Sequence, residues 1–297
     1  MDGLILIDKI ENITSYDVIK QVKRLFHTKK VGHCGTLDPF ASGLLVVGIN
    51  QATKVMSFLE HDYKEYIATV KLGSSTDSFD LTGKVVSESK INKISKENIE
   101  EVLKEFKGEI IQTPPIYSSI HVNGRHLYEY ARNNEEVEIP TRKVTIFDLK
   151  LLENDEESFT IYVKCSRGTY IRSLGVDIAK RLNNDAHLIK LRRISIGSIS
   201  VDKAISYSSL LKGEVSLKQV KDCLSFKQVT LESIGKLRRV YNGQNITLLE
   251  EKEEKILIID ENKAVAIYEY NEDGTYHCVR GIFDENIRFA RLKELQG

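Results

Sequence analysis

The chain has 297 residues, of which 41% are hydrophobic and 29% charged, so it can bury a core and is not disordered as a whole. The formal net charge is zero, which excludes a protein that binds nucleic acid by its overall charge alone. The charge is nonetheless uneven: residues 18–35 hold five Lys or Arg and no acid, and residues 161–200 hold eight Lys or Arg against two Asp. Two basic segments in a neutral chain are still compatible with a polyanion held in one groove.

The four cysteines are scattered and form no Cys-x-x-Cys pair, so the sequence predicts neither a zinc site nor a disulfide framework. The N-terminus has no basic stretch followed by a long apolar run, and no apolar stretch approaches the about 18 residues of a membrane span. We therefore expect a cytoplasmic protein without a metal site.

Apolar spacing and turn residues predict alternating strands and helices along most of the chain. In chain order we expect a buried strand over 3–8, a helix capped by Thr14 or Ser15 that runs to Leu25, a glycine-rich loop, buried framework over 43–48, a strand over 66–72, a helix over 95–106, paired strands over 144–152 and 159–165, and a helix over 171–182. Between them, residues 112–140 are long, polar and weakly periodic, which fits either an ordered excursion or a mobile loop that closes on a ligand.

The character of the sequence changes near Val229. Short strands are expected over 255–259, 264–270 and 276–282, separated by turn clusters at 260–263 and 271–274. This pattern predicts a small β domain at the C-terminal end.

The segment "VGHCGTLDPFASGLLVVGINQATK" places a single acid, Asp38, between a glycine loop and an apolar run. Pro39 disfavours helical backbone at Asp38 and favours extended or turn geometry. One interpretation is a turn cap, and the other is an isolated carboxylate presented to a ligand. His33 lies five residues earlier, and its plainest interpretation is a neutral imidazole bonded to the backbone.

Two further segments carry groups of interest. In "VKCSRGTYIRSLGVDIAK", Arg172 is either a solvated helix base or the partner of a buried carboxylate, a role that suits its permanent charge and planar fork. In "YKEYIATVKLGSSTDSFDLTG", Tyr66 lies on an expected strand, where a tyrosine is either core or a ring that stacks on a base.

These segments, with "QTPPIYSS" and "LRR", resemble the bacterial TruB family of tRNA pseudouridine-55 synthases, in the family's order from Gly3 to about Val201. The resemblance implies an α+β pseudouridine synthase fold with a mixed, largely antiparallel central sheet over residues 1–228. The tail, residues 229–297 with "YNGQNI", resembles a PUA-type RNA-binding domain.

The resemblance also implies a function and a set of site residues. It implies cofactor-free isomerisation of a flipped T-loop uridine, with Asp38 as the essential carboxylate, Tyr66 stacked on the uracil and Arg172 paired with Asp38. Tyr170 and Leu191 would line the uridine pocket, and His33 would lie near the flipped nucleotides. Asp38 has three possible roles, which are attack on the ring, attack on the sugar and removal of a proton.

The sequence departs from the family pattern in three places. Ile10 and Asn12 replace the usual Pro and Gly, the Tyr-Ser-Ala-x-Lys motif reads Tyr-Ser-Ser-Ile-His over 117–121, and Arg-x-Gly ends in Asn134. The second and third changes lie in the region that we suspect closes over RNA.

Other functions fit parts of the pattern. They are a pseudouridine synthase for another site or with a guide RNA, a non-catalytic tRNA-binding or folding factor, and a sugar hydrolase. The short N-terminus and the motif order favour an enzyme that acts on the T-arm of tRNA without a guide RNA or an obligate protein partner. The absence of a second acid near Asp38 in the sequence weighs against a hydrolase.

Overall fold

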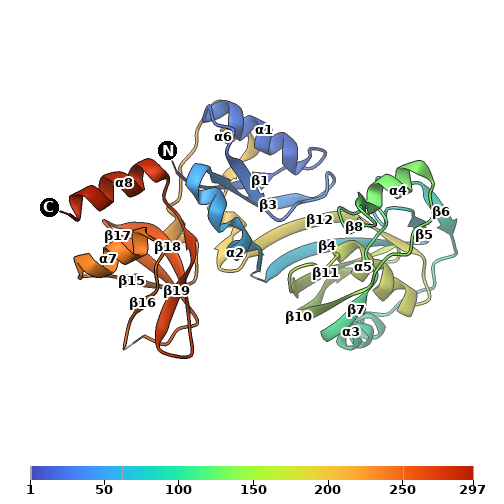
Figure 1. Cartoon of the computed structure of the whole chain (residues 1–297). Coiled ribbons are helices and arrows are strands. Elements are labelled where there is room, and N and C mark those ends of the chain that lie inside the picture. The colour runs from blue at the N-terminus through green and yellow to red at the C-terminus, as the bar shows by residue number, and fades with distance from the viewer. Residues whose placement is uncertain (1, 62, 250, 297) are drawn as a thin grey trace.

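The computed structural model describes residues 2–61, 63–249 and 251–296. A long curved sheet runs through the larger part of the molecule, and a smaller sheet formed by the C-terminal residues packs beside one end of it (Figure 1). Among the described residues, no helix is both long enough and apolar enough to cross a bilayer.

The central sheet has ten strands and is mixed, as predicted. Its main order is β14-β1-β3-β12-β4-β11-β10-β7, with β2 paired to β3 and β13 paired to β12. The β1–β14 and β3–β12 pairs are parallel and the others are antiparallel. The strands are β1 (Gly3–Lys9), β2 (Val31–Cys34), β3 (Ser42–Ile49), β4 (Lys64–Leu72), β7 (Gly108–Gln112), β10 (Arg142–Asn154), β11 (Ser158–Cys165), β12 (Ala186–Ile196), β13 (Ile199–Ser200) and β14 (Ile205–Ser206).

Helices and two short hairpins complete the larger part. The α-helices are α1 (Ser15–Leu25), α2 (Met56–His61), α3 (Lys96–Glu105), α4 (Leu127–Asn133), α5 (Ile171–Arg181) and α6 (Tyr207–Lys212), and the 3-10 turns are η1 (Asn50–Val55), η2 (Val201–Lys203) and η3 (Val220–Asp222). One hairpin joins β5 (Ser74–Thr76) to β6 (Val85–Glu88), and the other joins β8 (His121–Val122) to β9 (Arg125–His126).

Strands β1 and β3 are buried on both faces, which explains their continuous apolar runs. On β1, Ile5 and Ile7 point into the core beneath α1, α3 and α5, whereas Leu4 and Leu6 point to the opposite face. That opposite face also contacts the C-terminal sheet, because Leu257 and Ile267 belong to the same apolar cluster. The two parts of the chain therefore share a buried interface.

The predictions held best where the signal is local. Helix α1 begins after Thr14, whose hydroxyl accepts a hydrogen bond from the amide of Asp17 while the Asp17 carboxylate accepts one from the amide of Thr14. Ser95 caps α3 with its hydroxyl alone, which accepts a hydrogen bond from the amide of Asn98. The expected strands and helices at 66–72, 144–152, 159–165 and 171–182 are all present, with ends shifted by a few residues.

One region differs from the expectation, and in another the structure decides between two alternatives. The glycine-rich segment begins as a strand, β2, and only residues 35–41 form a loop. Residues 112–140 form an ordered excursion that holds the β8–β9 hairpin and α4.

Gly43 is required where β3 passes β12. Its φ is +103°, and a Cβ atom there would lie 2.2 Å from the carbonyl oxygen of Arg193. No side chain fits at that separation, so the glycine lets the two parallel strands approach and brings Arg193 beside the loop that carries Asp38.

The C-terminal sheet has five strands in the order β15-β17-β18-β19-β16. They are β15 (Lys227–Thr230), β16 (Ile246–Thr247), β17 (Lys255–Asp260), β18 (Lys263–Tyr270) and β19 (Thr275–Gly281), accompanied by α7 (Ile234–Tyr241) and α8 (Glu285–Glu294). The three strands predicted from the sequence correspond to β17, β18 and β19. The sheet starts with β15, two residues before Val229.

Candidate active site

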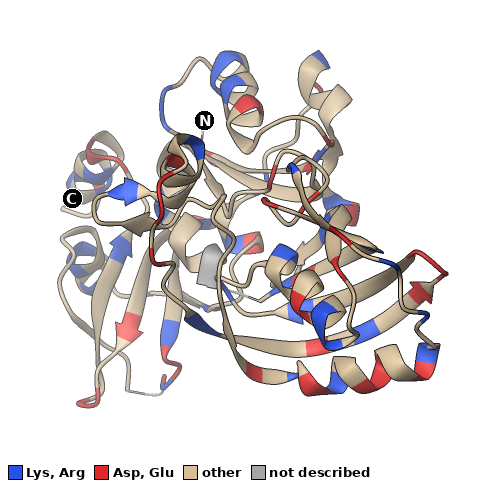
Figure 2. Ribbon diagram, turned by 90° about the vertical axis from the view of Figure 1, so that its right-hand side faces the viewer, with Lys and Arg blue, Asp and Glu red and all other residues tan. Residues whose placement is uncertain are grey.

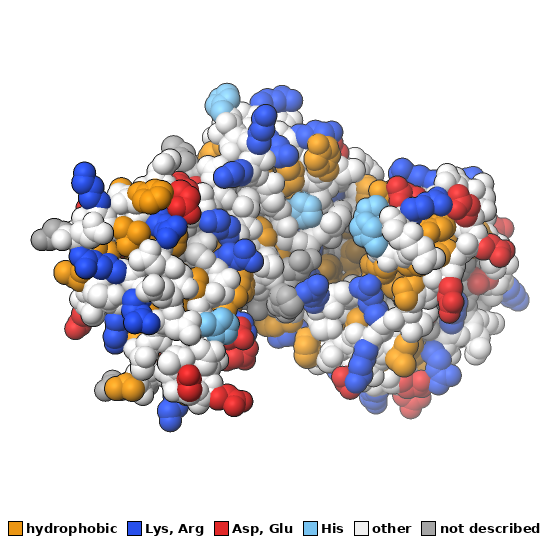
Figure 3. Space-filling view, in the orientation of Figure 1, with side chains coloured by type: hydrophobic (Ala, Val, Ile, Leu, Met, Phe, Trp, Pro, Cys, Tyr) orange, Lys and Arg blue, Asp and Glu red, His pale blue; other side chains and the backbone are white. Residues whose placement is uncertain are grey.

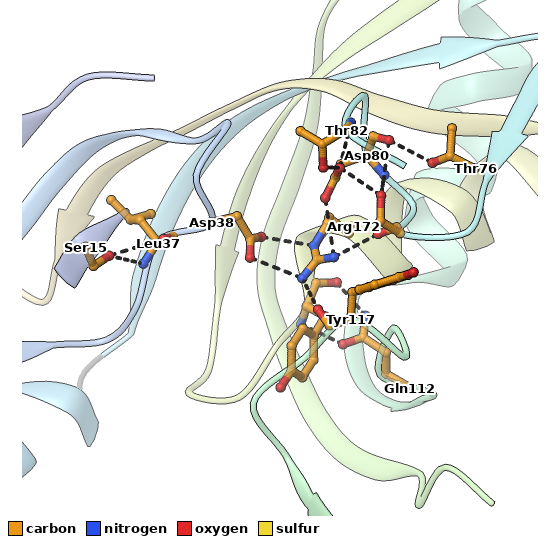
Figure 4. Close-up of polar contacts among 11 residues, drawn as sticks. Ser15, Leu37, Asp38, Thr76, Asp80, Thr82, Gln112, Tyr117 and Arg172 are labelled. Atoms are coloured by element: carbon orange, nitrogen blue, oxygen red, sulfur yellow. Dashed lines mark hydrogen bonds and ion pairs between the residues drawn. The ribbon is translucent and has the colours of Figure 1, made fainter. Parts of the chain in front are cut away.

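Asp38 and Arg172 form a two-point ion pair at a cavity of about 390 Å³. The Nε atom of Arg172 lies 3.0 Å from Oδ2 of Asp38, and its Nη2 donates to Oδ1 at 3.1 Å (Figure 4). Asp38 comes from the loop between β2 and β3, and Arg172 is the second residue of α5. The structure thus brings together two residues that are 134 positions apart in the sequence.

The remaining donors of Arg172 are also engaged. Its Nη1 donates to the carbonyl oxygen of Ser78 at 2.8 Å and lies 3.4 Å from Oδ2 of Asp80, and its Nη2 donates to the carbonyl oxygen of Tyr117 at 3.0 Å. Only 5% of the Arg172 side chain is exposed, so the interpretation as a solvated helix base is wrong. Five directed contacts fix the plane of the guanidinium and thereby the orientation of the Asp38 carboxylate.

Asp80 is a site residue that the sequence analysis missed. Its Oδ1 accepts hydrogen bonds from the hydroxyl of Ser78 at 2.8 Å, the amide of Thr82 at 2.9 Å and the hydroxyl of Thr82 at 2.5 Å. The available signal was its place in the "STDSFDLTG" segment that follows β4. Asp80 is buried behind Arg172 and is not among the residues that line the cavity.

The groups around Asp38 shift the pKa of its carboxyl in opposite directions. Burial raises the pKa of the Asp38 carboxyl above its ordinary value, the Arg172 guanidinium opposes this shift, and the Asp80 charge adds to it. About a third of the Asp38 side chain remains exposed, toward the cavity. Arg172 is therefore the main group that opposes the effect of burial and favours the ionised form of this carboxylate.

Tyr66 lies on β4, lines the same cavity and is 8% exposed. Burial raises the pKa of Tyr66 to about 12, against the opposing charge of Arg193. The phenol therefore keeps its proton at neutral pH and enters any reaction as a hydrogen-bond or proton donor.

Tyr170 and Leu191 also line the cavity, whereas His33 does not. Tyr170 is held by Gln112, whose amide accepts a hydrogen bond from the Tyr170 amide at 2.7 Å and donates to its carbonyl oxygen at 3.0 Å. His33 lies on β2 opposite Val47. Of the residues named from the sequence, all but His33 therefore meet at one cavity.

Two side chains from the N-terminal segment, Ser15 and Lys9, form hydrogen bonds with the backbone of the loop that carries Asp38. The hydroxyl of Ser15 accepts from the amide of Leu37 at 3.0 Å and donates to its carbonyl oxygen at 3.1 Å. The buried Lys9 ammonium donates to the carbonyl oxygens of Ile13 at 2.7 Å and Pro39 at 3.3 Å. Burial lowers the pKa of Lys9 to about 8, and the charge of Asp38 opposes that shift.

The cavity is hollowed into one face of the molecule, between the part that holds α1 and the part that holds α4 and α5, with Lys and Arg side chains beside it (Figure 3). Its charged lining consists of one acid, Asp38, and five bases, which are Lys64, Arg142, Arg167, Arg172 and Arg193. Such a site favours an anionic ligand that exposes one uncharged group to a carboxylate.

Comparison with known proteins identifies this arrangement. Residues 23–171 match the model of the TruB family pseudouridylate synthase N-terminal domain. The chain belongs to the TruB family. It is 38% identical to a tRNA pseudouridine synthase B of Francisella tularensis subsp. novicida, over 97% of this chain and 96% of that protein. A tRNA pseudouridine synthase B of Mycoplasma capricolum is 37% identical, over 96% of this chain and 98% of that protein.

Solved structures show the same fold at lower identity. The archaeal box H/ACA sRNP Nop10–Cbf5 complex contains a chain that matches with a TM-score of 0.71 and 22% identity, over 96% of this chain and 88% of that chain. An H/ACA RNP bound to a substrate RNA contains a chain that matches with a TM-score of 0.70 and 21% identity, over 96% of this chain and 86% of that chain. Both matches span the central sheet and extend into the C-terminal part.

The structure explains two departures from the TruB pattern. Asn12 and Asn134 stand where the family has glycine, and their φ values are +64° and +54°. Asparagine tolerates this left-handed conformation better than other residues with side chains. Asn134 ends α4 in this conformation, and the amide of Asn12 donates to the carbonyl oxygen of Pro39. The backbone path is thus retained without glycine.

Proposed function

We propose that this TruB family member converts uridine to pseudouridine at position 55 in the T-loop of tRNA. The observation that carries the proposal is the Asp38 carboxylate, which Arg172 aims at a cavity lined by Tyr66, Tyr170 and Leu191. The relatives named tRNA pseudouridine synthase B, which align over nearly the whole chain, support tRNA as the substrate.

The reaction is balanced without any added group. The bond from C1′ of the ribose to N1 of uracil breaks, a bond from C1′ to C5 forms, C5 loses a proton and N1 gains one. No water is incorporated and nothing is oxidised, so one carboxylate and a proton donor are enough. We assign these roles to Asp38 and Tyr66, with Arg172 as the residue that positions Asp38.

The cavity suits a nucleotide that has left its stack. Unstacking a base costs a few kcal/mol, which phosphate contacts and aromatic surfaces can offset. Tyr66 would stack on the uracil, Tyr170 and Leu191 would enclose it, and His33 would meet neighbouring nucleotides outside the cavity.

A sugar hydrolase fits less well, although the structure does place a second carboxylate near Asp38. Asp80 lies on the far side of Arg172, is saturated by Ser78 and Thr82 and does not line the cavity. It therefore lacks access to a substrate, whereas paired catalytic acids must both reach the scissile bond.

A direct test uses an unmodified T-arm stem–loop carrying tritium at C5 of its uridines, with no metal or cofactor added. Isomerisation must release the C5 tritium into water, and we expect one equivalent per stem–loop. Replacing the uridine at position 55 by cytidine should abolish the release. Release from that control, or none from the uridine stem–loop, would contradict the proposed reaction.

We further propose that residues 229–297 form a PUA-like RNA-binding domain, in a protein that works in the cytoplasm on its tRNA substrate. Acids and bases are mixed over the whole ribbon (Figure 2). Lys30, Lys54 and Arg280 nevertheless lie close together where this domain joins the larger part. The ammonium of Lys54 donates to the carbonyl oxygen of Phe283 at 2.7 Å, and its pKa is lowered by burial and by the charges of Lys30 and Arg280. Asp284 and Glu285 also act on Lys54 and offset part of this charge.

Arg280→Gln should therefore weaken tRNA binding by about tenfold and lower its salt dependence by about one phosphate contact. The single-turnover rate at saturating protein should stay at the wild-type value, since Arg280 lies on β19 of the C-terminal sheet and does not line the cavity. The matched control is Arg181→Gln, which removes an exposed arginine paired with Glu105 at the end of α5. Equal binding and equal salt dependence in both variants would contradict an RNA-binding role for this surface.

A further inference from the structure

One arginine in the cavity wall makes almost no polar contacts with the other described residues. Arg142, the first residue of β10, lines the cavity, and no carboxylate of the described residues lies within 4.0 Å of its guanidinium. Its one hydrogen bond is a long one, from Nη1 to the carbonyl oxygen of Gly168 at 3.4 Å. Its Nε atom is buried without a hydrogen-bond partner in the structure.

Buried donors without partners are rare, and each calls for a physical explanation, of which an absent ion is one. Two other arginines on this lining, Arg172 and Arg193, differ in this respect. The nitrogens of Arg172 contact Asp38, Asp80 and two backbone carbonyl oxygens. The buried Arg193 donates to the carbonyl oxygens of Leu44 at 2.8 Å and Gly35 at 3.0 Å.

Contacts with three neighbouring residues fix the position of Arg142. Its guanidinium lies over the ring of Tyr170, 5.3 Å from the ring centre, and its backbone pairs with that of Gln112, the residue that holds Tyr170. Gly168 provides the space, because a Cβ atom there would lie 3.1 Å from Nη1 of Arg142, and its φ of +81° also favours glycine. The "SRGTY" segment thus shapes the cavity wall around this one cation.

We infer that Arg142 binds a backbone phosphate next to the uridine that enters the cavity. This inference rests on the proposed function, because it takes the substrate to be RNA. An unpaired guanidinium offers a planar fork that matches two phosphate oxygens, and the net positive lining favours an anion. Since Tyr170 lies directly against Arg142, a nucleotide held by Tyr170 brings its own phosphates to the fork.

The test measures binding of an unmodified T-arm stem–loop in an Asp38→Asn background, so that the substrate is not consumed, from about 50 to 300 mM KCl. Arg142→Gln should bind about tenfold more weakly and should lower the slope of log affinity against log salt by about 0.7 to 0.9, the value for one phosphate. Arg142→Lys keeps the charge and should keep the slope, with binding within a few-fold. Arg181→Gln should match the parent protein in both measurements.

A second arm replaces, one at a time, the phosphates on the two sides of the target uridine by neutral methylphosphonates. One replacement should weaken binding to the parent protein about as much as Arg142→Gln does, and it should have no further effect in that variant. Additive losses at both phosphates would overturn the inference, as would an unchanged salt slope, which is what a mere support for Tyr170 predicts. Thermal melts establish folding, and if Arg142→Gln does not fold, the methylphosphonate comparison is made with Arg142→Met, which keeps much of the side-chain stem but no charge.

The same stem–loop separates this inference from the proposed function. Wild-type protein that releases no tritium from it contradicts the function. Wild-type protein that is active, together with an Arg142→Gln variant that has normal affinity and salt dependence, contradicts only the phosphate site.

Discussion

The Asp38→Asn variant should lose isomerase activity by a factor of about 10⁴ or more, which corresponds to about 5.4 kcal/mol of barrier. The amide keeps the shape of the side chain but carries no charge, and its NH2 group cannot accept a hydrogen bond from Arg172 as the second carboxylate oxygen does. Binding of tRNA should largely survive, because phosphate contacts supply much of the affinity of such complexes.

The rate is measured under single-turnover conditions with saturating protein, which separates chemistry from binding. Asp185→Asn serves as the matched control, since this surface carboxylate accepts a hydrogen bond from Ser87 and lies away from the cavity lining. Readily measurable turnover by a folded Asp38→Asn protein would remove Asp38 from its assigned role.

Replacement of Arg172 should have the next largest effect. Arg172→Met removes the charge and all five directed contacts, so we expect a rate lower by about 10³, or about 4 kcal/mol. Arg172→Lys keeps a charge but not the planar fork, and it should retain more activity than Met. Both variants should bind tRNA within about tenfold of wild type, because Arg172 is committed to protein groups rather than to the ligand.

The role of Arg172 also predicts in which direction the pH dependence of the rate should shift. Burial raises the pKa of Asp38 and Arg172 opposes the shift, so loss of the guanidinium should move that pKa further upward. In the proposed mechanism the ionised carboxylate is the active form, so the rate should fall as the pH drops through this pKa. The acid limb of the single-turnover profile should therefore lie at higher pH in Arg172→Met than in the wild type.

Loss of one partner of a buried pair also costs about 3–5 kcal/mol of folding stability, so thermal melts must precede the kinetics. A folded Arg172→Met protein with the wild-type rate and an unshifted acid limb would show that Arg172 does not organise Asp38.

Features set by local sequence were predictable in this chain. The start of α1 follows from Thr14 and Asp17, whose reciprocal hydrogen bonds need only three residues of spacing. The hairpin of β10 and β11 follows from two apolar strands that flank an acidic turn. Motif order added what spacing alone did not contain, namely that Asp38 and Arg172 meet.

The missed features depend on tertiary contacts. Strand β12 lies at the centre of the sheet, but its sequence carries Lys190, Arg192 and Arg193, and two register shifts against β4 disturb the alternation of side chains. The charge of Arg193 is accommodated by the carbonyl oxygens of Gly35, in the loop before β3, and of Leu44, on β3 itself, which are brought there only by the fold. Asp80 likewise becomes a site residue only because α5 places Arg172 beside it.

The most direct test of the account maps pseudouridine at single-nucleotide resolution in a full-length unmodified tRNA transcript, incubated with the wild-type protein in the presence of a chelator. Asp38→Asn protein is treated in parallel. We predict complete conversion of the T-loop uridine at position 55 by the wild type, no conversion elsewhere in the transcript, and none by the variant. No pseudouridine at this position with folded wild-type protein, or equal conversion by both proteins, would contradict the claim that Asp38 in this cavity isomerises that uridine.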